Sequence, residues 1–300
     1  MKVEAVQSSG GATRRVRTTR PPSPILTTLK YFWRSPSGVM GAVILILVLA
    51  GTLLGPFFYH VDAMDIAGAP FQEPSWDAWL GTDYLGRDVL AGLIHGGRAT
   101  LLVGSVAASI TIVIGVTVGA LSGFYGGLID KSFVKITEFF QVLPPLLFAM
   151  VLVTLFGQKL SVITVAIGAV SWTSAARLTR AEFMRLRSHD FVKASRACGA
   201  TDLHLILRVV LPNALPPIIV STALAVGTAV LFEGGLSFLG LGDPNTMSWG
   251  LMLGQNRNYM LDAWWAVTFP GAAIFLVILA MSLLGDGVTD AVNPRLRRRV

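Results

Sequence analysis

Long stretches without a charged side chain constrain this chain more strongly than any other feature of its sequence. Residues 35–60 and 99–129 contain no Asp, Glu, Lys or Arg. A helix of about 20 apolar residues crosses the ~30 Å hydrocarbon core of a bilayer, so each stretch is long enough for one spanning helix with room for tilt. The sequence therefore predicts a membrane protein before any motif is considered.

Three more stretches raise the predicted number of spans to six. Lys159 is the only charge in residues 139–176, and one helix of that length would be about twice as long as the bilayer is thick. We therefore expect a tight turn at residues 157–159 (Gly-Gln-Lys) between two spans. Residues 209–232 and 263–285 supply the fifth and sixth spans. The predicted fold class is an all-α membrane protein with six transmembrane helices and both termini on the same side.

The composition agrees with this class. Hydrophobic residues make up 53% of the chain and charged residues only 14%, and the mean hydropathy is +0.65, far from the values of an ordinary globular domain. The basic residues before the first apolar stretch also fit a signal peptide, but residues 59–62 (Tyr-His-Val-Asp) make a poor cleavage site because they lack small side chains. We expect an uncleaved first span.

The distribution of basic residues predicts the orientation. If the N-terminus is cytoplasmic, all but four of the 24 Lys and Arg residues lie in inner segments, and the four outside are Arg87, Arg98, Lys159 and Arg257. The net charge of +7 then reflects membrane topology rather than nucleic-acid binding, because no interleaved aromatic residues accompany the basic ones. Both termini are predicted to be cytoplasmic.

These assignments divide the chain into five parts. We expect a basic cytoplasmic tail at 1–34, the first transmembrane helix at 35–60, an external loop at 61–98, a transmembrane core at 99–285 with a cytoplasmic loop at 177–212, and a second basic cytoplasmic tail at 286–300. The external loop is acidic, whereas the cytoplasmic loop is basic and has a helical pattern.

The first half of the cytoplasmic loop predicts a short helix that ends at a glycine. Asp190 or Ser188 can cap this helix, and Gly199 can end it in a left-handed conformation. One face of the helix consists mostly of small side chains, and its members are Phe191, Ala194, Ser195 and Cys198.

A second helix follows the glycine. Thr201 or Asp202 can cap it, and Pro212 is expected to bend the chain into the fifth span. Its predicted apolar stripe consists of Leu203, Ile206, Leu207 and Val210. The loop is either a solvated connector or a docking element, because a short helix held rigidly between two spans can enter a cleft on a partner and pass its motion to the membrane helices.

The same loop resembles the EAA motif of ABC importer permeases. That pattern reads Glu-Ala-Ala, three residues, Gly, nine residues, a branched apolar residue, any residue and Leu-Pro. Its positions correspond here to residues 193–195 (Lys-Ala-Ser), Gly199, Val209 and residues 211–212 (Leu-Pro). Lys193 stands where the family has an acidic residue, and Ser195 replaces the second alanine.

The resemblance implies that this loop is the coupling helix that docks on an ATPase subunit. The candidate coupling residues are Asp190, Lys193, Ala194, Ser195, Gly199, Ala200, Leu211 and Pro212. We expect the small residues and the corner glycine, rather than Lys193, to carry the docking shape.

Other segments narrow the resemblance to the C-type second subunit of dipeptide/oligopeptide/nickel permeases. They are residues 80–90 (LGTDYLGRDVL), 236–242 (LSFLGLG), 248–250 (SWG) and 284–287 (LGDG) with Asp290 and Pro294. The resemblance covers about residues 31–297. In the external loop the candidate residues are Gly81, Thr82, Asp83, Gly86, Arg87 and Asp88. They either order the loop or contact an external binding protein, and Asp88 can cap a helix over residues 89–94.

The resemblance also implies a fold, a location and partners. The fold is the transmembrane domain of a type I ABC importer in the bacterial cytoplasmic (inner) membrane. The working unit is a heterodimer of two homologous permease subunits with two ATP-binding subunits and an external solute-binding protein. ATP and Mg belong to the ATPase subunits, and we expect no cofactor on this chain. The mechanism is alternating access.

Peptide is the first choice of substrate on family frequency alone. An importer of nickel or another small solute is the alternative. A different class, a membrane assembly or interaction protein without a transport role, is the rival interpretation.

The sequence contains no motif for catalysis or metal binding. GxxxxGK[ST], HExxH and GxSxG patterns are absent, so we expect no enzymatic activity from this chain. Cys198 is the only cysteine, so no intrachain disulfide can form. The histidines at positions 60, 95, 189 and 204 are scattered, so no metal site is predicted.

Charged residues and prolines within the spans are candidates for the transport pathway. Glu138 lies at the mouth of the third span and Glu233 near the outer end of the fifth, where each either contacts substrate, reaches an interface or bonds to a neighbouring helix. Three proline sites are either bends that line a pathway or static kinks, and they are Pro144 with Pro145, Pro216 with Pro217, and Pro270.

Overall fold

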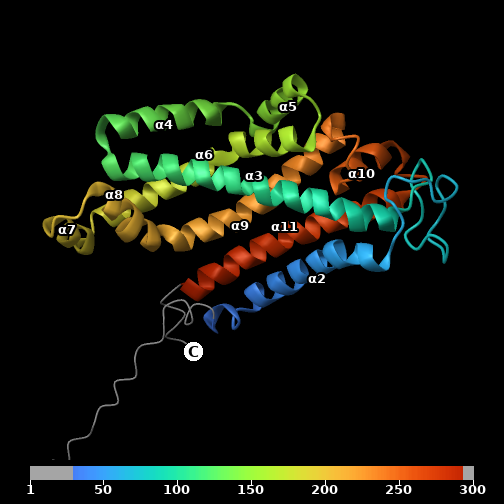
Figure 1. Ribbon diagram of the computed structural model, residues 1–300, viewed down its shortest axis with the longest axis horizontal. Helices are drawn as coiled ribbons and strands as arrows, with labels where there is room; N and C mark the ends of the chain where they lie inside the picture. The colour runs from blue at the N-terminus through green and yellow to red at the C-terminus, as the bar shows by residue number, and fades with distance from the viewer. Residues whose placement is uncertain (1–29, 293–300) are drawn as a thin grey trace, which may run out of the picture.

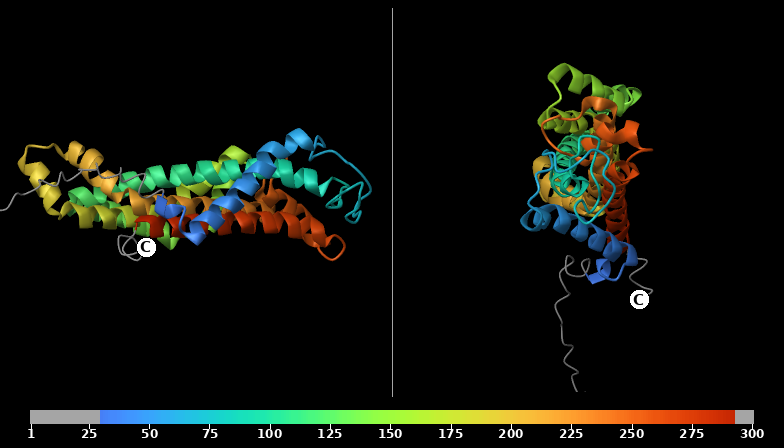
Figure 2. Two further views of the ribbon diagram at one scale, coloured as in Figure 1. Left: turned by 90° about the horizontal axis from the view of Figure 1, so that it is seen from below. Right: turned by 90° about the vertical axis from the view of Figure 1, so that its right-hand side faces the viewer.

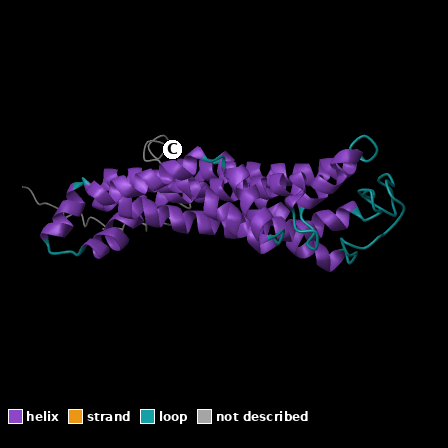
Figure 3. Ribbon diagram, turned by 90° about the horizontal axis from the view of Figure 1, so that it is seen from above, coloured by secondary structure: helices purple, strands orange, loops and turns teal. Residues whose placement is uncertain are grey.

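Helices make up the regular structure of the described part of the chain. The computed structural model describes residues 30–292, and in that range it contains two isolated β-bridges but no strand (Figure 3). The helices are α2 (Pro36–Phe58), α3 (Val89–Tyr125), α4 (Gly127–Val142), α5 (Pro145–Phe156), α6 (Leu160–Arg187), α7 (Asp190–Ala197), α8 (Asp202–His204), η1 (Leu205–Val210), α9 (Leu211–Leu236), η2 (Ser237–Leu241), α10 (Trp249–Asn256), η3 (Arg257–Tyr259) and α11 (Trp264–Val292).

The longest helices run along a common axis and form an elongated bundle (Figure 1). The loop that contains α7 lies at one end, which we call the α7 end. The loop at residues 59–88 lies at the opposite end together with α10 (Figure 2). The two loops predicted to lie on opposite sides of a membrane are therefore separated by the full length of the bundle.

Five helices are long and apolar enough to cross a membrane. They are α2, α3, α6, the continuous helix from α8 to η2, and α11. Helices α4 and α5 pass the same test only as a pair bent by 82°, so the predicted third span is not one straight helix. Leu143 and Pro144 take extended backbone at the break (ψ 126° and 119°), because a residue that precedes proline is disfavoured in the helical region.

Helix α3 begins at Val89, ten residues before the predicted second span, so Arg98 lies in a helix rather than in the external loop. Its Nε and Nη2 atoms donate to the carbonyls of Thr52 and Leu53 in α2, both at 3.1 Å. Pro56 lacks the N–H that would bond to the carbonyl of Thr52 within α2. The guanidinium of Arg98 therefore replaces a helical hydrogen bond that proline removes.

The turn predicted at residues 157–159, between the third and fourth spans, is confirmed. Helix α5 ends at Phe156 and α6 begins at Leu160, with Gly157 in a left-handed conformation (φ +98°). Helix α6 continues to Arg187, so the first eleven residues of the predicted cytoplasmic loop extend a membrane-spanning helix. The irregular part of that loop begins at Ser188.

Helices α3 and α6 form the most extensive helix–helix contact in the bundle. A Cβ atom added to Gly119 would lie 2.4 Å from the carbonyl oxygen of Ala176, and one added to Gly115 would lie 2.6 Å from the Cβ of Ala175. Four small residues of α3 are buried as well, and they are Gly104, Ala107, Ala108 and Gly115. Small side chains thus allow the two backbones to touch.

The two ends of the described chain lie side by side (Figure 1). The Oγ of Ser35, before α2, donates to Oδ2 of Asp290 in α11 at 3.0 Å. A Cβ added to Gly287 would lie 2.4 Å from the Cα of Gly38. Most of the two predicted basic tails lies outside the described residues, including Lys2, Arg14, Arg15, Arg17, Arg20, Pro294, Arg295, Arg297, Arg298 and Arg299.

Candidate coupling loop and polar sites

The predicted coupling loop contains the short helix α7. His189 occupies its N-cap position without a side-chain capping bond. The prediction that Ser188 or Asp190 caps this helix is wrong. The Oγ of Ser188 donates to the carbonyl of Arg185 at 2.7 Å and so completes α6, and Asp190 is already the first residue of α7.

Gly199 ends α7 in the predicted left-handed conformation (φ +87°). The N–H of Ala200 then donates to the carbonyl of Ser195 at 3.2 Å and closes the turn. Thr201 caps α8 as predicted, because its Oγ1 accepts from the N–H of His204 at 3.4 Å. A residue with a Cβ pays about 1–2 kcal/mol in the left-handed region, so the backbone itself selects glycine at this corner.

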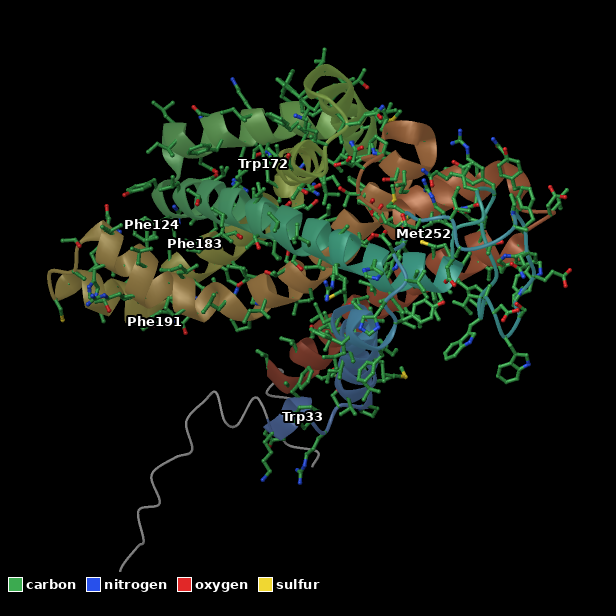
Figure 4. All side chains as sticks on the ribbon, turned by 45° about the vertical axis from the view of Figure 1, so that its right-hand side comes forward. Trp33, Phe124, Trp172, Phe183, Phe191 and Met252 are labelled. Atoms are coloured by element: carbon green, nitrogen blue, oxygen red, sulfur yellow. The ribbon has the colours of Figure 1, made fainter. Side chains whose placement is uncertain are left out.

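One buried residue attaches α7 to the bundle. Val192 is 3% exposed and belongs to an apolar cluster with Phe183 of α6 and Leu205 of η1. Phe191 and Cys198 are exposed, so most of the predicted docking face is open at this end of the molecule. Figure 4 shows Phe183 and Phe191 at the α7 end.

Arg196 provides a second attachment. Its Nη2 lies 3.0 Å from Oδ1 of Asp202 in α8, and its guanidinium lies 5.6 Å from the ring centroid of Phe124 in α3. Lys193 instead pairs with Asp190 within α7 at 3.2 Å. Both ion pairs are well exposed, and such surface pairs contribute about 0–1 kcal/mol each, but only the Arg196 pair reaches another helix. Arg196, rather than Lys193, therefore joins α7 to its neighbours.

The apolar stripe of the second helix differs from the prediction. Leu203 and Leu207 are 66% and 51% exposed, whereas Leu205, Ile206 and Val210 are buried. The segment η1 is π-helical. A π-helix has a wider turn than an α-helix, so α-helical spacing does not identify its buried positions.

Pro212 does not bend the chain away from this helix. The helix continues from α8 through η1 into α9, with Leu211 and Pro212 as the first residues of α9. The Nδ2 of Asn213 donates to the carbonyl of Val209 at 2.6 Å. The coupling loop therefore leads directly into a membrane-spanning helix.

The external-loop candidates order the loop through backbone bonds. Gly81 and Gly86 have positive φ angles of 76° and 81°. The Oγ1 of Thr82 accepts from the N–H of Gln72 at 2.8 Å and donates to the carbonyl of Ala69 at 2.6 Å. One threonine hydroxyl thus joins two parts of the loop.

The folded loop rests on α10 and α11. The indole Nε1 of Trp265 donates to the carbonyl of Thr82 at 3.0 Å. The N–H of Tyr84 donates to Oδ1 of Asn256 at 3.3 Å. These bonds connect the loop to helices far along the sequence.

Asp83 is a buried carboxyl in this loop. Its Oδ1 accepts from the backbone N–H groups of Leu85 at 2.8 Å and Arg87 at 2.9 Å. Burial raises the pKa of Asp83 above its ordinary value, although these hydrogen bonds favour the ionised form. Arg87 in turn donates from Nη1 to Oε1 of Gln255 at 3.4 Å.

Asp88 caps α3, as predicted. Its Oδ1 accepts from the N–H of Ala91 at 2.8 Å, and its Oδ2 accepts from the hydroxyl of Tyr59 at 2.6 Å. The same carboxylate therefore orders the start of α3 and the end of α2. Contact of this loop with a binding protein stays a prediction.

Glu233 is fully buried, with 1% of its surface exposed. Its Oε1 accepts from the hydroxyls of Ser248 at 2.7 Å and Ser237 at 2.9 Å, and Oε2 accepts from Thr100 at 3.4 Å. The Oγ1 of Thr100 also accepts from the N–H of Trp249 at 3.1 Å. Of the alternatives open for Glu233, the structure shows a bond to neighbouring helices, because its carboxyl group joins α9 to α3 and to the start of α10.

The other pathway candidates have different environments. Glu138 is exposed on α4 and lines a cavity between α3, α4 and α6. Pro144 and Pro145 form the sharp break described above. Pro216 and Pro217 lie inside the continuous helix α9 and line an apolar hollow of about 560 Å³ between α6, α9 and α11. Pro270 is buried in α11.

An ion pair that the sequence reasoning missed ties α4 to α6. Arg180 donates from Nε to Oδ1 of Asp130 at 2.6 Å and from Nη2 to Oδ2 at 2.7 Å. The hydroxyl of Ser122 in α3 also donates to Asp130. The sequence shows that the inner segments contain many arginines, but the spacing of these arginines does not show which one faces Asp130.

Comparison with known proteins identifies the family. The family of inner membrane components of binding-protein-dependent transport systems matches residues 115–298, more than half of the chain. The chain belongs to this family.

Two relatives show how far the family resemblance extends. The di/tripeptide transport system permease protein DppC of Pseudomonas aeruginosa (strain UCBPP-PA14) is 38% identical over 288 residues, covering 92% of this chain and 94% of that protein. The dipeptide transport system permease protein DppC of Haemophilus influenzae (strain ATCC 51907 / DSM 11121 / KW20 / Rd) is 34% identical over 289 residues, covering 94% and 98%. Among solved structures, the inward-facing MetNI methionine ABC transporter is 19% identical with a TM-score of 0.49 and covers 66% of this chain and 96% of that chain.

As a transport-system inner membrane component, the chain is a multi-pass permease and not itself an enzyme. Its family works with a substrate-binding component and an ATPase component. The match begins within α3 and includes α7 and α9, so the coupling loop lies inside the family region. Helix α2 and the external loop precede it.

Proposed function

We propose that this permease forms half of a translocation pathway for di- and oligopeptides in an ATP-driven importer. The observation that carries the proposal is full-length similarity, since two relatives named for di/tripeptide or dipeptide transport align over more than nine-tenths of this chain and of their own. The described spans supply a scaffold of suitable length.

The complete transporter combines this chain with a second, homologous permease subunit, two ATP-binding subunits and an external solute-binding protein. It resides in a bacterial inner membrane, with both termini and α7 on the cytoplasmic side. ATP and Mg bind to the ATPase subunits, and this chain binds no cofactor.

Helix α7 is the proposed contact with an ATPase subunit. Val192 and Arg196 fix it to the ends of α3, α6 and α8, so a push on α7 is transmitted to these elements. The unbroken helix from α8 into α9 then carries the displacement into the membrane. Alternating access follows if the two permease subunits respond together.

The test is to purify this chain with the products of its neighbouring genes and to reconstitute the complex in lipid. Vanadate-sensitive ATP hydrolysis is measured with and without the binding protein loaded with a peptide mixture, and peptide uptake is measured in parallel. Stimulated hydrolysis with uptake is the expected result. A stable complex that contains no ATPase subunit would overturn the proposal.

A further inference from the structure

A small cavity lies between α3, α4 and α6. Its volume is about 210 Å³. The residues of α4 that line it are Val134, Thr137, Glu138 and Gln141, which share one helical face. From α6, Arg177 and Arg180 face the same cavity.

Two opposite charges in this cavity have no partner within residues 30–292. Arg180 is already bound to Asp130, which closes one ion pair between the helices. Among the described residues, neither the carboxylate of Glu138 nor the guanidinium of Arg177 makes a hydrogen bond or a salt bridge, and both side chains are exposed. The Asp130–Arg180 ion pair is therefore formed, whereas the carboxylate of Glu138 and the guanidinium of Arg177 line the same cavity without bonding to each other.

The unpaired groups are suited to a ligand that carries both charges. A carboxylate accepts hydrogen bonds only, and a guanidinium presents five donors in a planar fork that matches another carboxylate. Placed in one cavity, Glu138 and Arg177 complement an ammonium group and a carboxylate that belong to one small molecule. The other cavity walls include Val118, Gly119 and Ala176, which supply no further charge.

The two sides of the cavity belong to helices with different surroundings. Arg177 stands on α6, whose backbone touches α3 at Gly119 and Ala176. Glu138 lies on α4. This helix is preceded by a turn at Gly126 and Gly127, both with positive φ, and is followed by the break at Pro144. A ligand that joined the two charges would therefore connect α4 to α6 at a second point beside the Asp130–Arg180 pair.

We propose that Glu138 and Arg177 bind the free amino and carboxyl ends of a short peptide during its passage. This rests on the proposed function and specifies which residues recognise the substrate class. Main-chain ends are common to all peptides, so this contact accepts many sequences. The cavity is smaller than the ~300–1,000 Å³ of sites for drug-sized ligands, which favours a dipeptide.

The experiment uses the purified permease–ATPase complex in lipid nanodiscs without the binding protein. Calorimetric titration measures the affinities of Ala-Ala, N-acetyl-Ala-Ala and Ala-Ala-amide. Glu138→Gln is expected to weaken Ala-Ala about tenfold and to leave the acetylated probe unchanged, because that probe lacks the ammonium group. Arg177→Gln is expected to weaken Ala-Ala by a similar factor and to leave the amide unchanged.

Lys135→Gln is the matched control, since Lys135 is an exposed charge of α4 outside the cavity lining. It should leave all three affinities unchanged. Equal losses for all probes in both test variants would overturn the proposal and indicate an internal ion pair that forms elsewhere in the cycle. The lipid is then varied. If wild type binds Ala-Ala more weakly in phosphatidylethanolamine nanodiscs than in phosphatidylglycerol nanodiscs, and Glu138→Gln shows no such difference, a lipid headgroup occupies the site. This result would also overturn the proposal.

Failure of the proposed function gives a different result. In that case wild-type proteoliposomes with the binding protein take up no peptide. If wild type takes up peptide but unblocked Ala-Ala binds Glu138→Gln, Arg177→Gln and wild type with equal affinity, only the assignment of Glu138 and Arg177 is lost.

Discussion

Glu233 shows how one buried side chain can hold three helices at once. A carboxyl group inside a membrane protein is costly unless its oxygens are bonded. Here three hydroxyls converge on it from α3, η2 and the start of α10. Each donor would itself be left without its acceptor if the carboxyl group were removed.

Glu233→Ala should therefore destabilise the permease strongly, since each unsatisfied buried hydroxyl costs about 1–3 kcal/mol. Glu233→Gln, which keeps one acceptor oxygen, should lose clearly less. The measurement is the thermal unfolding midpoint of the purified complex. Glu182→Ala, at a partly exposed carboxylate paired with Arg185, is the control and should change little. Equal midpoints for Glu233→Ala and Glu182→Ala would contradict the role assigned to Glu233.

Asp83 gives a pH-dependent prediction. Because burial raises its pKa in the folded loop, this carboxyl stabilises the fold most below its unfolded pKa of about 3.9. That contribution is lost as the pH rises through the folded pKa. Asp83→Asn keeps an acceptor for the N–H groups of Leu85 and Arg87 but cannot ionise. The unfolding midpoint of Asp83→Asn minus that of wild type should therefore be larger at pH 7.5 than at pH 4.5.

Asp77→Asn is the matched comparison for this measurement, because Asp77 is an exposed acid of the same loop. Its midpoint difference from wild type should not depend on pH. If Asp83→Asn shows the same difference from wild type at both pH values, the burial argument for Asp83 fails.

At the scale of elements, the orientation of α7 depends on Gly199. A Cβ added there meets no atom within 4 Å, so only backbone conformation opposes a substitution. Gly199→Val should lower peptide-stimulated ATP hydrolysis severely, because a β-branched residue is disfavoured in the left-handed region. Gly199→Asn should retain most of it, since Asn visits that region. Lys193→Ala should keep peptide-stimulated ATP hydrolysis near the wild-type rate. If Lys193→Ala lost more of this activity than Gly199→Val, the greater importance assigned to Gly199 would be wrong.

The elements also show where sequence reasoning succeeds. The caps at Asp88 and Thr201 and the turn at Gly199 were predicted because each depends on a few adjacent residues. The apolar stretches located the spans for the same reason. The 82° bend between α4 and α5 and the π-helical register of η1 were not predicted, because packing against other helices selects among the conformations that the local sequence permits.

For the polar sites, too, the sequence indicates a residue but not its distant partner. Glu233 was singled out because a charge within a span is rare, but its partner Thr100 lies 133 positions away and no spacing rule connects them. The Asp130–Arg180 pair was missed for the same reason, since 50 positions separate its members. Sequence identified residues that need a partner, and the fold supplied the partners.

For the whole molecule, the proposed orientation can be tested through the single cysteine. Cys198 is exposed at the α7 end. A membrane-impermeant maleimide should label it in inside-out vesicles and not in intact spheroplasts, and bound ATPase subunits should slow the reaction. Trp76→Cys in a Cys198→Ser background should show the opposite pattern, because Trp76 is 94% exposed in the external loop. Labelling of Cys198 in spheroplasts would invert the topology.

The pairing of α2 with α11 has a consequence for biogenesis. Ser35 and Asp290 are 255 positions apart, yet they bond directly. The first span can pack against α3 early in synthesis, but its contact with α11 forms only after the last span has been synthesised. During that interval the glycine face at Gly38 and Gly41 is open to lipid and to other nascent chains, so a chaperone or insertase that shields it would raise the yield of assembled permease.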